Sequence, residues 1–182
     1  MFAEQGAHVV FTYVSSDEKA NALKAELESK GVKAMAFKFN VADYAACESM
    51  VADVMKELER IDVVINNAGI THLPKPMETV SDEEFDRVFN VNCKSVYLMA
   101  RAFNGMMIQA GAGAVLNVAS TAGLSPRPNL NWYNASKGWM ITATKTMAVE
   151  LAPKGIRVNA LCPVAGETPL LASFLGEDTP EM

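Results

Sequence analysis

Tyr133 and Lys137 are the two residues of this sequence whose types and spacing most directly suggest proton-transfer chemistry. They stand four positions apart in a segment of helical character, so both side chains lie on one face of the helix. A tyrosine hydroxyl has an ordinary pKa of about 10, and a nearby ammonium lowers that pKa because it favours the phenolate. The pair is therefore a candidate acid–base unit, with a surface lysine one turn from a packed tyrosine as the alternative interpretation.

Three further groups of polar residues stand where a ligand could be bound. Ser120 ends the strand-like stretch AVLNVAS, where its hydroxyl could donate to a carbonyl oxygen that gains negative charge, or cap a turn. Asn92 lies in an apolar helical stretch, so its amide either satisfies a buried group or interrupts the helix to hold a water. Residues 66–69, NNAG, follow another strand and let the backbone approach a flat ligand, unless they are simply a turn.

The elements that would position these residues alternate between strand-like and helix-like segments. This order predicts an α/β fold, a doubly wound Rossmann-like parallel sheet with helices on both faces. The apolar stretch 61–66 is typical of a buried parallel strand. Capping boxes at 15–18 and 81–84 and a cap at Asp43 mark helix starts. We expect strands over 8–14, 33–39, 61–66, 114–119 and 156–161, and helices that include 91–109, broken by Gly111 and Gly113, and 132–152.

The composition predicts one globular domain over residues 1–182. Half of the residues are hydrophobic, one fifth are charged and the net charge is −5, which argues against a nucleic-acid or anionic membrane surface. The three cysteines are widely spaced, as expected of reduced thiols in a cytoplasmic protein, and the two histidines are far from them and from each other. No metal site is therefore predicted, and no apolar run is long enough to span a bilayer.

These pieces together resemble the short-chain dehydrogenase/reductase family, specifically members such as 3-oxoacyl-carrier-protein reductases. The NNAG stretch matches a motif of that family. Ser120 precedes Tyr133 by 13 residues and follows Asn92 by 28, which with Lys137 reproduces the family's catalytic tetrad in order and spacing. Each motif alone is weak, whereas all of them in register are a strong signal that covers essentially the whole chain.

The resemblance implies an oxidoreductase that transfers a hydride between a nicotinamide cofactor and a carbonyl or secondary alcohol. Tyr133 would exchange a proton with the substrate oxygen, Ser120 would hydrogen-bond that oxygen, and Lys137 would lower the tyrosine pKa and bind the nicotinamide ribose. Asn92 would anchor a water that relays protons. The resemblance places the cofactor against Tyr13, Ser15, Ser16, Asn40, Val41, Asn67, Ala68, Gly69, Tyr133, Lys137, Pro163 and Thr168.

The cofactor preference depends on the end of the first strand, where NAD-preferring members of the family place an acidic residue. Here Tyr13 holds that position, followed closely by Ser15 and Ser16. Because no carboxylate there repels a 2′-phosphate and two hydroxyls could bind one, NADP is favoured over NAD. Asn40 replaces the aspartate that contacts adenine in many members, and residues 163–164, Pro-Val, replace a Pro-Gly pair.

The family's glycine-rich TGxxxGxG turn and its first strand are missing from this sequence. From the family's length we expect further residues before Met1 and after Met182, including a last strand. Without the turn, the cofactor pyrophosphate lacks its usual helix N-terminus. Our hypothesis is that the isolated chain binds cofactor poorly and has little activity, and the alternative function is an inactive fragment or a partner for intact subunits.

Two other interpretations have less support. A sugar-nucleotide epimerase also uses a Tyr-x-x-x-Lys pair, but the NNAG motif and the serine–tyrosine spacing argue against it, and a pure binding module leaves the tetrad unexplained. The resemblance also implies a homodimer or homotetramer and a small-molecule substrate, here a 3-oxoacyl thioester, a simple secondary alcohol or a sugar. Four apolar residues near the tyrosine could form one wall of the substrate pocket, namely Leu130, Trp132, Trp139 and Leu170. The two tryptophans could equally belong to the core or to a subunit interface.

Overall fold

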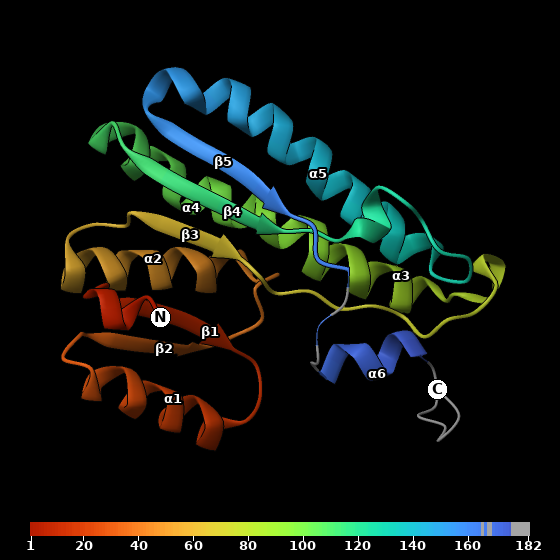
Figure 1. The fold of residues 1–182 in the computed structure, drawn as a ribbon, viewed down its shortest axis with the longest axis horizontal. Helices are drawn as coiled ribbons and strands as arrows, with labels where there is room; N and C mark the ends of the chain where they lie inside the picture. The colour runs from red at the N-terminus through yellow and green to blue at the C-terminus, as the bar shows by residue number, and fades with distance from the viewer. Residues whose placement is uncertain (165, 167–168, 176–182) are drawn as a thin grey trace. The chain divides into compact units, whose positions relative to one another are not determined.

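The computed structural model describes residues 1–164, 166 and 169–175 (Figure 1). The chain divides into two compact units, Met1–Arg60 and Ile61–Met182, and each is described here by itself. All five strands expected from the sequence are present and every strand pair is parallel, so the prediction of a Rossmann-like α/β fold is confirmed. That residues 1–182 form a single domain stays a prediction.

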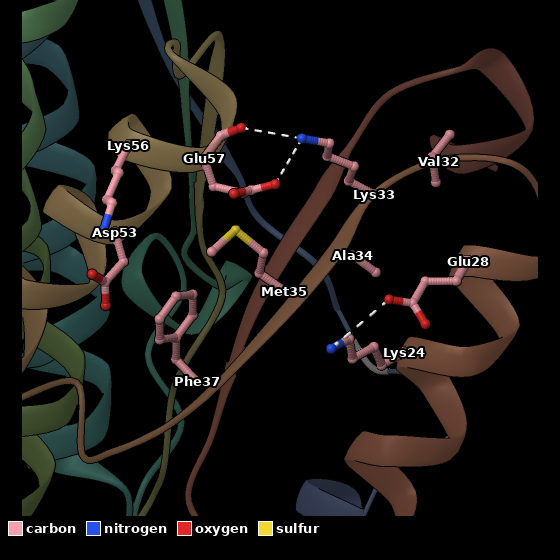
Figure 2. A pocket seen from close by; sticks show the side chains of 10 residues that line it. All are labelled: Lys24, Glu28, Val32, Lys33, Ala34, Met35, Phe37, Asp53, Lys56 and Glu57. Atoms are coloured by element: carbon pink, nitrogen blue, oxygen red, sulfur yellow. Dashed lines mark hydrogen bonds and ion pairs between the residues drawn. The ribbon is translucent and has the colours of Figure 1, made fainter.

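The first unit is a two-stranded parallel sheet with its connecting helices. In chain order its elements are η1 (Ala3–Gln5), β1 (Val9–Tyr13), α1 (Asp17–Ser29), β2 (Ala34–Lys38) and α2 (Tyr44–Leu58). β1 pairs with β2 from Val9 to Tyr13, and α1 and α2 lie on the two sides of β2 (Figure 2). The side chain of Asp43 accepts a hydrogen bond from the Ala46 N–H at 3.2 Å, which confirms the predicted cap of α2.

An open groove of about 610 Å³ follows the side of β2 and is lined from α1, β2 and α2 (Figure 2). Met35 and Phe37 lie at its centre, and charged side chains surround them. Lys33 pairs with Glu57 at 2.7 Å, and Lys24 pairs with Glu28 at 3.8 Å. Charged side chains along a strand that pairs on one side only discourage pairing with another chain, so we interpret this groove as a protected sheet edge.

The second unit is a three-stranded parallel sheet in the order β3-β4-β5. Its strands are β3 (Val63–Asn66), β4 (Gly113–Val118) and β5 (Ile156–Leu161). Its helical elements are η2 (Met77–Thr79), α3 (Asp82–Phe89), η3 (Asn90–Lys94), α4 (Ser95–Ala110), η4 (Thr121–Gly123), α5 (Asn131–Leu151), η5 (Ala152–Lys154) and α6 (Pro169–Leu175). Because the strands are parallel and in register, their carboxyl ends lie at one edge, where Asn66 pairs with Asn117 and Val118 with Leu161.

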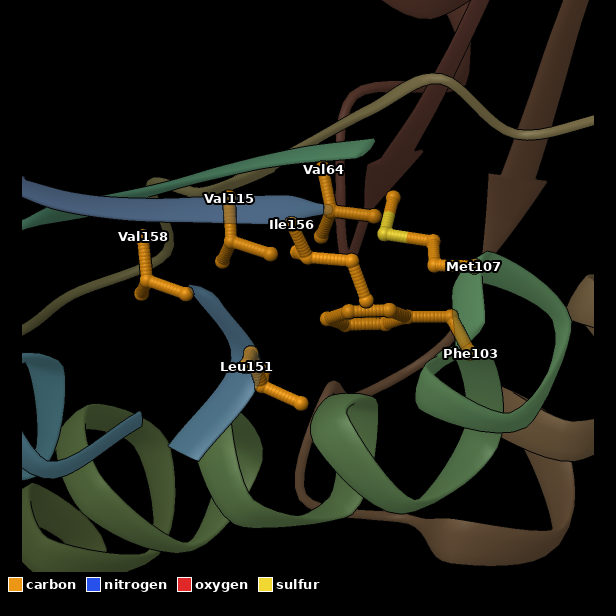
Figure 3. Close-up of a cluster of buried hydrophobic side chains, with 7 residues drawn as sticks. All are labelled: Val64, Phe103, Met107, Val115, Leu151, Ile156 and Val158. Carbon is orange, nitrogen blue, oxygen red and sulfur yellow. The ribbon is translucent and has the colours of Figure 1, made fainter. Parts of the chain in front are cut away.

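The core of the second unit lies between this sheet and the helices α4 and α5. Phe103 of α4 is fully buried, at 0% exposure, among aliphatic side chains from the three strands and the end of α5 (Figure 3). The cluster consists of Val64, Phe103, Met107, Val115, Leu151, Ile156 and Val158. Burial of this apolar surface fixes the two long helices against the sheet.

Three local predictions were wrong. The capping box at 15–18 does not form, because α1 begins at Asp17 and its cap residue, Ser16, has φ +70° and makes no side-chain cap. Gly113 does not break a helix but begins β4, while Gly111 ends α4 in the left-handed conformation. The stretch 61–66 is not buried on both faces, because α4 and α5 pack on one face and Val63 is 51% exposed. The capping box at 81–84 is confirmed.

We expect Phe103→Ala to lower the free energy of unfolding by about 3–5 kcal/mol, because the substitution leaves a cavity in a closely packed cluster. Val149→Ala on α5 is the control, since Val149 is 77% exposed and its truncation should change that free energy by no more than about 0.5 kcal/mol. Urea denaturation of both variants measures the effect. Equal losses for the two variants would show that the cluster does not carry the stability of this unit.

Candidate active site

Tyr133 and Ser120 come together at the carboxyl edge of the three-stranded sheet. Ser120 follows β4 directly, and Tyr133 lies in the first turn of α5. Both are buried, at 8% and 4% exposure. Burial raises the pKa of the Tyr133 hydroxyl, and a side-chain hydrogen bond with Ser120 opposes that rise. The Ser120 hydroxyl also accepts from the Ala122 N–H at 3.1 Å. It therefore caps the turn, as predicted, and also lowers the pKa of Tyr133.

Lys137 lies one turn after Tyr133 and is also buried, at 4% exposure. Its Nζ donates to the Val118 carbonyl at 2.8 Å and lies 5.9 Å from the centre of the Tyr133 ring. Burial lowers the pKa of Lys137 to about 8. The lysine was expected to lower the tyrosine pKa, but the contributions that lower it here come from Ser120 and Arg127.

Asn92 lies in a π-helical turn, η3, between α3 and α4. It is fully buried, and its amide accepts from the Ile70 N–H at 2.9 Å and donates to the Ile70 carbonyl at 2.9 Å. A second N–H of the same amide donates to Ser136 Oγ at 2.9 Å. The amide therefore satisfies buried groups, which was the first of the two alternatives, while the water of the second alternative stays a prediction. A π turn of this kind often marks a functional position.

Ser136 connects Asn92 to the helix that carries the tyrosine and the lysine. Its hydroxyl accepts from Asn92 and donates to the Tyr133 carbonyl at 2.7 Å, and its own carbonyl accepts from the Cys93 thiol at 3.6 Å. Burial raises the pKa of Cys93 to about 11, so this thiol stays protonated. Asn92 and Cys93 of the π turn thus both form hydrogen bonds with Ser136, which lies on α5 between Tyr133 and Lys137.

The NNAG stretch follows β3 and lies against the same group. A methyl group added at Gly69 would lie 3.3 Å from Lys137 Nζ and 3.6 Å from Asn92 Oδ1, so the bare backbone of Gly69 lies close to these two polar atoms. Asn66 donates to Asn117 Oδ1 at 2.8 Å. Asn67 and Ala68 are exposed, so they are accessible to a ligand.

A second corner with polar side chains lies in the first unit, at the carboxyl ends of β1 and β2. The Tyr13 hydroxyl donates to Asp17 Oδ1 at 3.0 Å, and Lys38 Nζ lies 2.6 Å from Asp17 Oδ2. The hydrogen bond to Asp17 raises the pKa of Tyr13. Ser15 and Ser16 are exposed beside this group. No carboxylate was expected here from the sequence, but the first turn of α1 brings Asp17 into contact with Tyr13.

The remaining predicted cofactor residues are distributed over both units. Asn40 Oδ1 accepts from the Ala42 N–H at 3.0 Å in a turn after β2, and Val41 is half-buried in that turn. The Pro163 carbonyl after β5 accepts from the Thr121 N–H at 3.1 Å. Thr168 lies outside the described residues. The assembly of the residues from 1–60 with those from 61–182 around one cofactor stays a prediction.

Sequence reasoning missed several residues of the site. Ser136 could have been found from its position three residues after Tyr133 on the same helix face. Asn117 and Thr144 form a buried hydrogen bond of 2.8 Å beneath the site, and Asn117 was visible as the one polar residue of an apolar strand. No sequence signal pointed to Phe174 of α6, whose ring packs edge-on against Tyr133 at 4.9 Å between centres.

The four residues of the suggested apolar wall differ in their surroundings. Trp132 packs edge-on against Phe85 at 5.4 Å and donates from Nε1 to the Met77 carbonyl at 3.2 Å. Trp139 is 40% exposed, Leu130 is buried and Leu170 is half-buried. That these residues line a substrate pocket stays a prediction.

Comparison with known proteins places this arrangement in a family. Residues 1–178 match the short chain dehydrogenase family. The chain belongs to the short-chain dehydrogenase family. Over 140 residues it is 48% identical to 4-formylbenzenesulfonate dehydrogenase of Comamonas testosteroni, covering 76% of this chain and 54% of that protein. It thus spans about half the length of this curated relative.

Solved structures of the family agree with the fold. A 3-ketoacyl-(acyl-carrier-protein) reductase from Brucella melitensis, complexed with NADH, is 43% identical with a TM-score of 0.89, over 96% of this chain and 71% of that one. A gluconate 5-dehydrogenase from Burkholderia cenocepacia, in complex with NADP and tartrate, is 30% identical with a TM-score of 0.87, over 97% of this chain and 68% of that one. Similarity at this level confirms the family and the fold.

Within the described residues of this family member, no group of His, Cys, Asp or Glu side chains is arranged to hold a metal ion. In the same part of the chain, none of the helices combines the length and apolar character needed to cross a membrane. The three cysteines are free thiols.

We expect Ser136→Ala to lower the free energy of unfolding by about 1–3 kcal/mol, because it leaves a buried Asn92 N–H without its acceptor. Thr146→Ala, which removes an exposed hydroxyl from the same helix, is the control and should change stability by about 0.5 kcal/mol or less. Chemical denaturation gives both values. A loss no larger than that of the control would mean that the Asn92–Ser136 bond does not stabilise the fold.

Lys137 should make stability rise with pH. Its folded pKa of about 8 lies below the ordinary value of about 10.4, so between these values the unfolded chain binds more protons than the folded one. Relative to Lys137→Met, the wild-type free energy of unfolding should therefore rise above pH 8, by up to about 1.4 kcal/mol per pH unit. Denaturant titrations from pH 7 to pH 10 test this, and a difference that does not change with pH would contradict it.

Proposed function

We propose that this chain is an oxidoreductase that transfers a hydride between NADP(H) or NAD(H) and a carbonyl or secondary alcohol. Asn92, Ser120, Tyr133 and Lys137 form its site. The observation that carries the proposal is the placement of the buried Ser120 and Tyr133 at the same sheet edge, where Ser120 lowers the pKa of the Tyr133 hydroxyl, with Lys137 and the bare backbone of Gly69 beside them. The relatives described above are dehydrogenases and a reductase, which agrees with this chemistry.

The residues around Gly69 include groups that could hold a nicotinamide cofactor. The bare backbone of Gly69 lies close to Lys137 Nζ, a donor that could bind the ribose hydroxyls. Asn67 and Ala68 supply exposed backbone and amide groups on the same loop. The bound cofactor supplies the hydride, and the protein's part is to bind, to orient and to move the proton.

The proton is moved by Tyr133. Because burial raises its pKa, the hydroxyl is protonated at neutral pH and is a proton donor, as reduction of a carbonyl requires. Ser120 donates a hydrogen bond to the substrate oxygen as negative charge develops there. Lys137, with a pKa of about 8, can return a proton toward Tyr133, and Asn92 anchors the water that connects the lysine to solvent. The reverse sequence oxidises an alcohol.

NADP(H) is our preferred cofactor, because Lys38 places a cation beside Tyr13, Ser15 and Ser16, where a 2′-phosphate would be bound. NAD(H) is the alternative, since Asp17 in the same corner can accept from a ribose hydroxyl.

The substrate is proposed to be a 3-oxoacyl thioester, a simple secondary alcohol or a sugar. We also propose a cytoplasmic homodimer or homotetramer that uses α4 and α5, where Tyr97 and Trp139 are half-exposed.

A second candidate function rests on one feature of the sequence. The 182 residues contain no glycine-rich phosphate-binding turn, and such a turn normally binds the pyrophosphate. The chain as given would then be inactive and act only as a fragment or as a partner of intact subunits. Restoration of activity on mixing with an inactivated homologous subunit would support this alternative.

We expect Tyr133→Phe to lower turnover by about 10²–10⁴-fold, because the proton donor is lost, while NADPH binding is unchanged. Ser29→Ala, which removes an exposed hydroxyl from the end of α1, is the control and should keep full turnover. Nicotinamide fluorescence measures binding of NADPH and NADH, and absorbance at the nicotinamide band measures turnover of carbonyl substrates. Turnover that survives in Tyr133→Phe would overturn the proposed role, and wild-type binding without turnover would favour the inactive chain.

A further inference from the structure

The turn η4, which follows Ser120, packs on α5 through a single glycine. A β-carbon built at Gly123 would lie 2.7 Å from the Gly138 nitrogen and 2.7 Å from the Lys137 carbonyl carbon. Non-bonded heavy atoms prefer about 3.5–4.0 Å, so any side chain there overlaps the backbone of α5. The third contact, at 2.9 Å, is Ile141 Cδ1, which could rotate away, whereas the two backbone atoms of the helix cannot.

This requirement is for space and not for backbone conformation. Gly123 is not among the glycines with positive φ, so its backbone is open to any L-residue. Two other glycines show the contrast. A methyl group at Gly138 would meet the Gly123 carbonyl oxygen at an ordinary 3.6 Å, and one at Gly105 on α4 would meet nothing within 4 Å. Gly123 is thus the position at which an added methyl group would force η4 and α5 apart.

Movement of Gly123 is transmitted directly to Ser120. The Gly123 N–H donates to the Ser120 carbonyl at 3.1 Å, and the Ala122 N–H donates to Ser120 Oγ at 3.1 Å, so the turn moves as one hydrogen-bonded unit. On the other side of the contact, α5 carries Tyr133 and Lys137. The closeness of the turn to α5 therefore sets the distance between the serine and tyrosine hydroxyls.

We propose that Gly123 is a positioning residue for the reaction, which keeps Ser120 within hydrogen-bonding reach of Tyr133 by allowing η4 to lie directly on the α5 backbone. This inference rests on the proposed function. It concerns a residue that touches neither the substrate nor the cofactor and acts only through the placement of Ser120.

The test is Gly123→Ala with two matched glycine controls. The added methyl group must displace η4 from α5 by roughly an ångström, and a misplacement of that size can lower the rate about 100-fold. We expect kcat to fall by about that factor, with NADPH binding and its dissociation constant unchanged. Gly138→Ala and Gly105→Ala should keep kcat, because their methyl groups meet ordinary contacts or open space.

A double substitution separates positioning from general damage. If Gly123 acts through Ser120, then adding Gly123→Ala to Ser120→Ala should lower kcat little further, because the group to be positioned is already gone. A loss of the same factor in both backgrounds would overturn the proposal. So would a Gly123→Ala variant with full kcat.

Two further measurements keep the proposal falsifiable. Should Gly123→Ala not fold, Gly138→Val presses on the same contact from the helix, and unchanged kcat in that folded variant overturns the proposal. If the wild-type chain shows no turnover, the proposed function fails, but the inference about Gly123 can still be tested. A crystal structure of Gly123→Ala or Gly138→Val then shows whether Ser120 has moved. A Ser120 hydroxyl that keeps its place beside Tyr133 overturns the inference, and one that moves away from it supports the inference.

Discussion

The side-chain amide of Asn92 joins three segments that are far apart in the sequence. It pairs with both backbone groups of Ile70 after β3 and donates to Ser136 on α5, while its own backbone lies in the π turn between α3 and α4. A buried amide left without partners is strongly unfavourable, so the loop, the π turn and α5 must keep this arrangement together. The position of Gly69, Tyr133 and Lys137 depends on it.

Burial gives the site its electrostatic character. It raises the pKa values of Tyr133 and Cys93 and lowers that of Lys137, and each shift favours the uncharged form. The result is a tyrosine that holds its proton beside a lysine that can release one. The lysine of a surface Tyr–Lys pair would keep its ordinary pKa of about 10.4, so the proposed proton transfer depends on the packing of α5 against the sheet edge and not on the motif alone.

Most of the fold and the identity of the proposed site residues could be predicted from the sequence. The five strands follow from apolar, β-branched segments separated by helical ones, and parallel strands bring NNAG, Ser120 and Pro163 to one edge. The spacing of Tyr133 and Lys137 requires one helix face. The failures were local: Ser16 makes no cap because its backbone is left-handed, and Val63 is exposed because α4 and α5 cover one face of the sheet.

The sequence by itself determined the helices and strands, because hydrophobic periodicity is a local property, and its resemblance to a family predicted which residues would carry the chemistry. Only the tertiary structure decided the partners of these residues. That Asn92 binds Ile70 and Ser136, that Asp17 and Lys38 meet Tyr13, and that Gly123 touches α5 are contacts between distant or differently folded segments. Such contacts depend on packing at distances of a few ångströms, which residue types and spacings do not encode.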